Sequence, residues 1–181
     1  MTLAQFDHVC RAAAAIAGVK KIYAFGANAI IPWLAQFGFP IPLSDLESSR
    51  DVDVTVGDAD LDLRIDGAIG EFSLFDQTFS VYAHSVDFAL FQAPMNWQQR
   101  EGKRMEPTSG VEIIAPHPHD LIISKLAVGR PKDFAFAVVV ARLFPMTDIE
   151  LYNLIDEFRN AHPQAEAALR GNVEIWQNKT R

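Results

Sequence analysis

Polar and β-branched residues alternate from Asp51 to Val56, and this alternation is typical of a β-strand with one buried face. Successive side chains of a strand point to opposite faces, so Asp51 and Asp53 share a face, with Cα atoms roughly 6–7 Å apart. Two like charges ~4 Å apart repel by about 4 kcal/mol at an effective dielectric constant of about 20. A cation between the carboxylates would remove this repulsion. Mg²⁺ suits the position because it prefers oxygen ligands and keeps waters that substrate phosphates can replace.

The same alternation has a simpler interpretation. Val52, Val54 and Val56 can form the buried side of a half-exposed strand, and the carboxylates between them can face solvent. Six acidic residues lie between residues 51 and 66, so an acidic surface would be ordinary here. Spacing alone leaves both a metal site and a solvated strand face open.

Length and composition predict a globular protein with a sizeable core. The chain has 181 residues, which suits one domain or one domain with a small appendage. Apolar residues make up 49% of it, and no apolar run reaches the ~18–20 residues of a membrane span. The N-terminus lacks a signal-peptide pattern and Cys10 is the single cysteine. We therefore expect a cytoplasmic protein without an internal disulfide or a membrane partner.

The negative charge is concentrated in the first part of the chain. The net charge is −7; residues 1–102 contain six Lys and Arg but thirteen Asp and Glu, whereas residues 103–181 contain ten of each kind. Binding along a phosphate backbone normally needs a basic face, so an RNA acceptor, although open, is not indicated by the charge. A small nucleotide that meets the acidic residues through metal ions is compatible with this balance.

Hydrophobic periodicity predicts an α/β part at residues 1–115 and a helical part at residues 116–181, packed as a single compact unit around a sheet of four or five strands. The predicted strands cover residues 21–25, 51–56, 78–83, 86–91 and 111–115, with loops at 39–43 and 92–110. The strands at 78–83 and 86–91 form a predicted hairpin, and Asp87 begins its second strand. Pro32 should kink the helix predicted to end near residue 38, or delay the start of that helix. The predicted helices cover residues 2–17, a segment ending near 38, 58–71, 120–129, 131–144, a segment starting at 147 or 148, and 163–176.

Three features follow one another in an informative order. A predicted strand ends in the small-residue turn Gly26-Ala27-Asn28, the Asp51-Val52-Asp53 pair follows, and Asp87 lies in a later apolar strand. This order resembles the nucleotidyltransferase superfamily that includes polymerase-β-like enzymes. The segment His119–Asp133 resembles a helix pair of small bacterial nucleotidyltransferase-like proteins, among them toxin components of toxin–antitoxin pairs. The resemblance covers roughly residues 20–140.

The resemblance implies a minimal nucleotidyltransferase fold, in which a mixed sheet is flanked by helices and followed by a C-terminal helical part. It also implies transfer of a nucleoside monophosphate from an NTP to an unknown acceptor, with Mg²⁺ as the cofactor. A protein partner such as an antitoxin, or self-association, is a further implication. The implied catalytic and metal-binding residues are Asp51, Asp53 and Asp87, and the implied nucleotide-binding residues are Gly26, Ala27, Asn28, Arg50, Lys125 and Arg130.

The chain departs from the family pattern at Ala27. The family commonly has Gly-Gly or Gly-Ser in this turn, and alanine offers only its backbone N–H where serine adds a hydroxyl. The departure leaves open a second interpretation, in which the fold acts without catalysis as a nucleotide sensor or an interaction protein.

Some implied residues also have structural interpretations. Asp87 is typical of a turn at a strand start, and Asn28 is typical of a helix cap. Lys125 can extend from a buried helix face to the surface, and Arg130 can be a charge at a helix boundary.

Overall fold

The computed structural model describes residues 1–41 and 49–180, which form two compact units. Of the described residues, the first unit contains 1–41, 49–91 and 101–116, and the second contains 92–100 and 117–180. The loop predicted at residues 39–43 lies partly outside the described residues. Within them, no helix combines the length and the apolar character that crossing a membrane requires.

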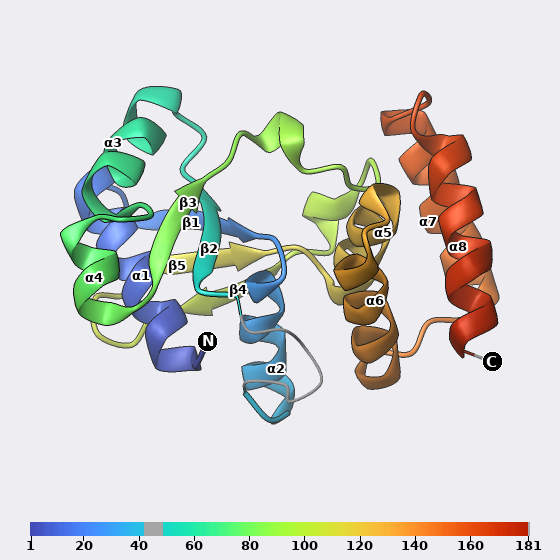
Figure 1. Cartoon of the computed structure of the whole chain (residues 1–181), viewed down its shortest axis with the longest axis horizontal. Helices are drawn as coiled ribbons and strands as arrows, with labels where there is room; N and C mark the ends of the chain where they lie inside the picture. The colour runs from blue at the N-terminus through green and yellow to red at the C-terminus, as the bar shows by residue number, and fades with distance from the viewer. Residues whose placement is uncertain (42–48, 181) are drawn as a thin grey trace. The chain divides into compact units, whose positions relative to one another are not determined.

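Among the described residues, five strands form one mixed sheet in the first unit (Figure 1). The strands are β1 (Lys21–Phe25), β2 (Asp51–Thr55), β3 (Tyr82–Ser85), β4 (Gly102–Met105) and β5 (Glu112–Ala115). β1 pairs antiparallel with β2 and parallel with β5, β2 pairs parallel with β3, and β4 pairs antiparallel with β5. The order is β3-β2-β1-β5-β4, so the predicted mixed sheet flanked by helices is confirmed.

Two helices, α1 (Leu3–Ala17) and α3 (Ala59–Ile69), supply the apolar residues that cover one face of this sheet. The alternate residues of the central strands point into this core, among them Ala24, Val52 and Val54, which are fully buried. Both helices begin as their sequences predict, since Thr2 and Gln5 form a capping box on α1 and the Asp58 carboxylate caps α3.

A short 3₁₀ helix separates the turn after β1 from the second α-helix of the chain, so that α-helix begins late. Asn28–Ile30 form a short 3₁₀ helix, η1, and α2 (Ile31–Phe37) follows. Pro32 lies in the first turn of α2, where its missing N–H breaks no helical hydrogen bond. The delayed start that Pro32 predicted is therefore present.

β4 lies in the segment that was predicted to be a loop at residues 92–110, so this part of the prediction is wrong. The polar residues around β4 are used in ion pairs with α1. Arg104 donates to both oxygens of Asp7, at 2.9 and 2.7 Å, and Arg11 donates to Glu106 at 3.0 Å. Pairing with β5 and these contacts with α1 stabilise a strand whose own sequence is hydrophilic.

The predicted strand at residues 78–83 is only partly right. Leu74–Phe79 form a helix, α4, which is capped by the Ser73 hydroxyl as acceptor for the backbone N–H of Asp76. β3 then begins at Tyr82 and pairs with β2, which is distant in the sequence. The cap and the long-range pairing together move the strand a few residues along the chain.

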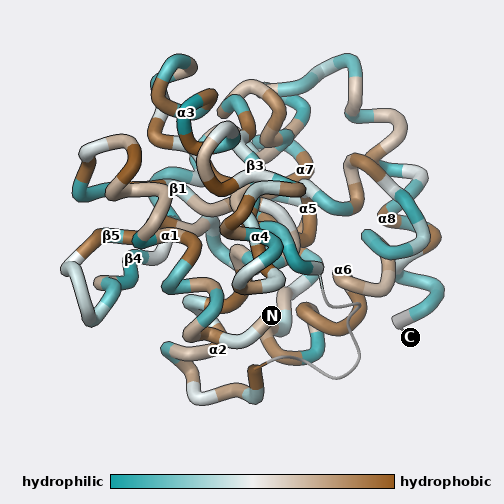
Figure 2. The backbone as a smooth tube through the Cα atoms, turned by 60° about the vertical axis from the view of Figure 1, so that its left-hand side comes forward, coloured by the Kyte–Doolittle hydropathy of each residue, from teal (hydrophilic) through white to brown (hydrophobic). Residues whose placement is uncertain are grey.

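The second unit contains α5 (Pro118–Val128), α6 (Pro131–Leu143), α7 (Asp148–Ala161) and α8 (Glu166–Thr180), and η3 (Trp97–Gln99) precedes them. Two helices begin where the sequence predicts: Pro131 lies in the first turn of α6, and Thr147, with Glu150, forms a capping box on α7. Apolar residues recur between polar ones along α7 and α8 (Figure 2). The apolar residues at helical spacing along α7 are buried: Leu151, Leu154, Ile155 and Phe158.

We expect Glu106→Gln to lower the free energy of unfolding at neutral pH and to change it little in strong acid. Burial alone would raise the pKa of Glu106, but hydrogen bonds from Ser109 and Thr108 hold this pKa at about 2, below its ordinary value of 4.5. A carboxyl whose pKa is lowered on folding stabilises the fold above its unfolded-state pKa. This contribution is lost as the pH falls through the folded-state pKa. Urea titrations at several pH values measure the difference.

Glu112→Gln is the matched control, because Glu112 is a half-exposed carboxylate on the adjoining strand β5. Its effect on the free energy of unfolding should be small at every pH. If the loss caused by Glu106→Gln stayed constant from neutral pH to about pH 2, the proposed role of the Glu106 hydrogen bonds would be wrong.

Candidate metal site

Asp51 and Asp53 lie on the face of β2 opposite to the packed core. Val52 and Val54 are fully buried in that core, whereas the two aspartates are half-buried. Side chains of a strand alternate between faces, so the two carboxylates share one face, as the sequence pattern predicted. This face is the starting point of the site.

His84 joins the two aspartates from the neighbouring strand. β3 runs parallel to β2 with His84 opposite Asp53, and His84 Nδ1 lies 3.0 Å from Asp53 Oδ1. One ligand atom from each of Asp51, Asp53 and His84 lies within 4.8 Å of the others. We call these three residues the Asp-Asp-His group.

Sequence interpretation missed His84 because it placed the residue in the turn of a hairpin. A signal was nevertheless present, since Val81 and Ala83 are apolar and alternate with Tyr82 and His84. Extending the period-two pattern by one residue would have placed His84 on the polar face of a strand. Only the parallel register with β2 shows which residue it meets.

Gly26 allows Asp53 to stand beside the turn that follows β1. Antiparallel pairing places Phe25 opposite Asp53, and Gly26 is the next residue, with φ +69° in the left-handed region. A Cβ atom added at Gly26 would overlap Oδ2 of Asp53. In the structure the Asp53 carboxylate approaches Gly26; the nucleotide contact that the resemblance implies for Gly26 stays a prediction.

The donor atoms of the Asp-Asp-His group fit a divalent cation. Carboxylate oxygens suit Mg²⁺ and Mn²⁺, and imidazole nitrogen suits transition ions. Neighbouring ligands of an octahedral ion with bonds of ~2.1 Å are ~3.0 Å apart, which is the separation of His84 Nδ1 and Asp53 Oδ1. The side chains of His84 and Asp53 are 60% and 25% exposed, so the group is open to solvent and to a substrate.

Among the described residues, Asp87 lies outside this group. The strand predicted at residues 86–91 is wrong, because Asp87 caps the 3₁₀ helix η2 (Phe88–Leu90) and its carboxylate accepts from the Ala89 N–H at 2.8 Å. The apolar residues that predicted a strand are used in aromatic packing, in which the Phe88 ring meets the Phe25 ring edge-on at 5.5 Å. An imidazole lies beside Asp53, where a third carboxylate was expected.

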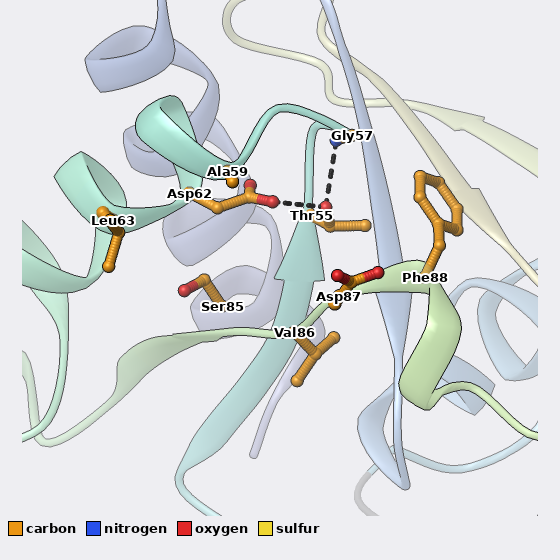
Figure 3. A pocket seen from close by; sticks show the side chains of 9 residues that line it. All are labelled: Thr55, Gly57, Ala59, Asp62, Leu63, Ser85, Val86, Asp87 and Phe88. Carbon is orange, nitrogen blue, oxygen red and sulfur yellow. Dashed lines mark hydrogen bonds between the residues drawn. The ribbon is translucent and has the colours of Figure 1, made fainter.

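Asp87 instead lines a pocket of about 430 Å³ where β2 and β3 end (Figure 3). The Thr55 hydroxyl donates to Asp62 at 2.6 Å and accepts from the Gly57 N–H at 2.9 Å, which closes one wall. The described lining residues include Asp62 and Asp87, and none of them has a basic side chain. Because phosphates need positive charge or backbone donors, this pocket suits a neutral or cationic group better than a triphosphate.

Asn28 connects the turn after β1 to the start of β2. Its amide donates to the backbone carbonyls of Asp51 and Ser49, at 2.7 and 3.3 Å. Ala27 has a helical backbone and occupies the cap position of η1. The contact made by Asn28 positions the carboxylate strand; contacts of Ala27 or Asn28 with a nucleotide stay predictions.

Arg50 lies directly before β2 and forms an ion pair with α4. Its Nη2 atom lies 2.7 and 3.0 Å from the two carboxylate oxygens of Asp76, and its guanidinium lies 5.8 Å from the Tyr82 ring centroid. The arginine side chain is 55% exposed, so donors remain available at the surface. A nucleotide contact by Arg50 stays a prediction.

Lys125 and Arg130 lie in the second unit, where both meet Asp133. Arg130 Nε is 2.7 Å and Lys125 Nζ is 3.8 Å from this buried carboxylate. Burial acts to raise the pKa of Asp133, but Arg130 and Lys125 hold it below its ordinary value. The two cations therefore stabilise the junction of α5 and α6, and their nucleotide contacts stay predictions.

Comparison with protein families identifies the chain. Residues 9–166 match the family described as Nucleotidyltransferase of unknown function (DUF6036). The match covers most of the chain, so the protein belongs to this family of nucleotidyltransferases. Comparison with curated proteins and with solved structures found no match.

We expect Gly26→Ala to destabilise the fold more than Gly18→Ala does. Both glycines have φ +69°, and a residue with a Cβ pays about 1–2 kcal/mol in this conformation. A Cβ at residue 18 would meet nothing within 4 Å, whereas one at residue 26 would displace the Asp53 carboxylate. Overpacking of this kind costs about a further 1–3 kcal/mol. Urea denaturation of the two variants measures the difference, and equal losses would refute the contact between Gly26 and Asp53.

Proposed function

We propose that this protein is a divalent-cation-dependent nucleotidyltransferase that moves a nucleoside monophosphate from an NTP to an acceptor hydroxyl. The observation that carries the proposal is the Asp-Asp-His group, whose ligand atoms lie within 4.8 Å of one another. Membership of a nucleotidyltransferase family provides the chemical context for this group. Mg²⁺ is the ion that the sequence resemblance implies.

Asp51 and Asp53 would hold the cation, because their carboxylates share one face of β2 and are open to solvent. A bound divalent cation neutralises charge on the triphosphate and lowers the pKa of the attacking hydroxyl. In the transfer, the acceptor hydroxyl would lose its proton to water, its oxygen would form a bond to the α-phosphorus, and the bond from that phosphorus to pyrophosphate would break. The two carboxylates also keep this face acidic, so a triphosphate binds well only together with a cation.

The residues around the carboxylates would hold them in place before a ligand arrives. Asn28 holds the backbone of Asp51 through a hydrogen bond of 2.7 Å, and the Asp53 carboxylate packs against the turn at Gly26. Stabilisation of charge in a transition state is most effective when the charged groups need not rearrange during the reaction. Carboxylates held by these contacts suit a catalytic role better than carboxylates on a flexible surface would.

The charge distribution favours a small nucleotide over a polynucleotide as the ligand. The first part of the chain has a strong acidic excess, and none of the described residues that line the pocket at the ends of β2 and β3 is basic. An extended phosphate backbone would be repelled by such a surface. A protein partner, self-association and a cytoplasmic location stay predictions from the resemblance and the composition.

Two observations favour a second candidate function, a nucleotide-binding module without catalysis. Ala27 replaces the second glycine or the serine of the family turn, and Asp87 lies outside the Asp-Asp-His group. Such a module would bind an NTP with a cation but would release no pyrophosphate. Measuring binding and pyrophosphate release on the same sample separates the two functions.

We expect Asp53→Asn to abolish stabilisation by a divalent cation plus an NTP. A ligand at a hundred times its Kd stabilises the fold by about 2.7 kcal/mol, which a thermal melt detects easily. The variant should keep its fold, because Asp53 lies on the solvent-facing side of β2. The measurement is a melt with each NTP and the cation, for wild type and variant.

Asp60→Asn is the matched control, since it removes an exposed acid from the first turn of α3 at some distance along the chain. It should retain the full ligand-induced shift. If Asp53→Asn showed a ligand-induced melting shift as large as that of the wild type, Asp53 would not be part of the site. The absence of any shift in the wild-type protein with every nucleotide would contradict both candidate functions.

A further inference from the structure

We propose that His84 is the third protein ligand of this site, and that its imidazole makes the site prefer Mn²⁺ to Mg²⁺. The proposal rests on the proposed function in one respect only, namely that Asp51 and Asp53 bind a divalent cation. It replaces the third carboxylate expected from the sequence with a nitrogen ligand and so changes the class of metal.

The position of His84 follows from the sheet rather than from a flexible loop. Parallel pairing sets His84 opposite Asp53, and the same register continues through Val54 and Ser85. The imidazole therefore starts from a backbone that is fixed by the strand pairing. Its Nδ1 atom lies 3.0 Å from Asp53 Oδ1, a distance at which both atoms can bind one ion.

The other acidic side chains near this edge of the sheet are used in structural contacts. Asp62 accepts from Thr55 and from the backbone of Val56, Asp66 accepts from Ser85, Asp76 pairs with Arg50, and Asp87 caps η2. Each of these contacts satisfies a helix end, a strand end or an ion pair. Among the histidine, cysteine and acidic side chains of the described residues, His84 is the one placed close enough to Asp51 and Asp53 to share an ion with both.

An imidazole ligand changes which ion binds best. Mg²⁺ is a hard cation that prefers oxygen ligands and loses its waters reluctantly, so a nitrogen ligand adds little to its affinity. Mn²⁺ accepts carboxylate oxygen readily and, as a first-row transition ion, also gains from nitrogen ligands. Two carboxylates with one imidazole are therefore a better donor set for Mn²⁺ than for Mg²⁺.

A hydrogen bond between His84 and Asp53 accounts for the same distance when no cation is bound. In that state Nδ1 carries the proton and donates to the carboxylate. As a metal ligand, Nδ1 must be without its proton, which then resides on Nε2. The two roles are separated by detecting a direct bond between the metal and nitrogen.

The test uses Mn²⁺ as the probe with the full-length protein. Electron paramagnetic resonance measures free Mn²⁺ and so gives the Kd of Mn²⁺ for the protein. Competition with Mg²⁺ gives the preference of the site for Mn²⁺ over Mg²⁺. Spin-echo modulation detects nitrogen bound directly to the Mn²⁺ ion. We expect nitrogen modulation in the wild-type protein and its loss in His84→Ala. We also expect His84→Ala to weaken Mn²⁺ binding at least about tenfold, since even outer contacts of a metal site are worth 10–100-fold. The effect on Mg²⁺ should be smaller, below about threefold.

Two further variants make the result specific. His84→Asp supplies a third carboxylate and should shift the preference back toward Mg²⁺, and Asp87→Asn should keep the wild-type affinity and nitrogen signal. Loss of Mn²⁺ binding in Asp87→Asn would overturn the assignment of His84.

The failures of the two proposals are distinguishable. Tight Mn²⁺ binding without nitrogen modulation, unchanged in His84→Ala, would overturn the role of His84 and leave the metal site of Asp51 and Asp53 intact. Absence of any bound divalent cation in the wild-type protein would overturn both. His84 is exposed, so its variants should melt like the wild type in the absence of metal, and this is checked first.

Discussion

Close packing of the Asp53 carboxylate against the Gly26 turn is the contact on which the candidate site depends. It requires a glycine in the left-handed conformation, because a side chain at that position would occupy the space of the carboxylate. Antiparallel pairing of β1 with β2 brings the turn to Asp53, and parallel pairing of β2 with β3 brings His84 to its other side. The three strands thus determine the site together.

The acidic residues of the first unit fall into two kinds, those in ion pairs and those of the candidate site. Asp7 and Glu106 are buried and meet arginines of neighbouring elements, and Asp76 meets Arg50. These pairs compensate the cost of removing a charge from water. The Asp-Asp-His group is different, because its carboxylates lie two residues apart on a solvent-facing strand with an imidazole beside them. In the function proposed above, a divalent cation would relieve this local charge.

Local signals predicted most of the helices and the central strands. Caps at Thr2, Asp58 and Thr147 and the proline at the start of α6 act over a few residues, so the sequence contains the whole interaction. β4 was missed because its own residues are polar, and its stability comes from pairing with the next strand, β5, and from ion pairs with α1, which is distant in the sequence. The strand expected at residues 86–91 failed for the converse reason: its apolar residues pack as an aromatic cluster after the Asp87 cap.

For the candidate site, the sequence by itself determined that Asp51 and Asp53 share one face and that Gly26 lies in a turn, because strand alternation and glycine conformation are local properties. Only the tertiary structure decided which side chains meet them. Register between strands distant in sequence placed His84, and not Asp87, beside Asp53, and it turned Gly26 toward a carboxylate. A shift of one residue in strand pairing exchanges the two faces of a strand, so a ligand set contributed by two strands is decided by the folded sheet.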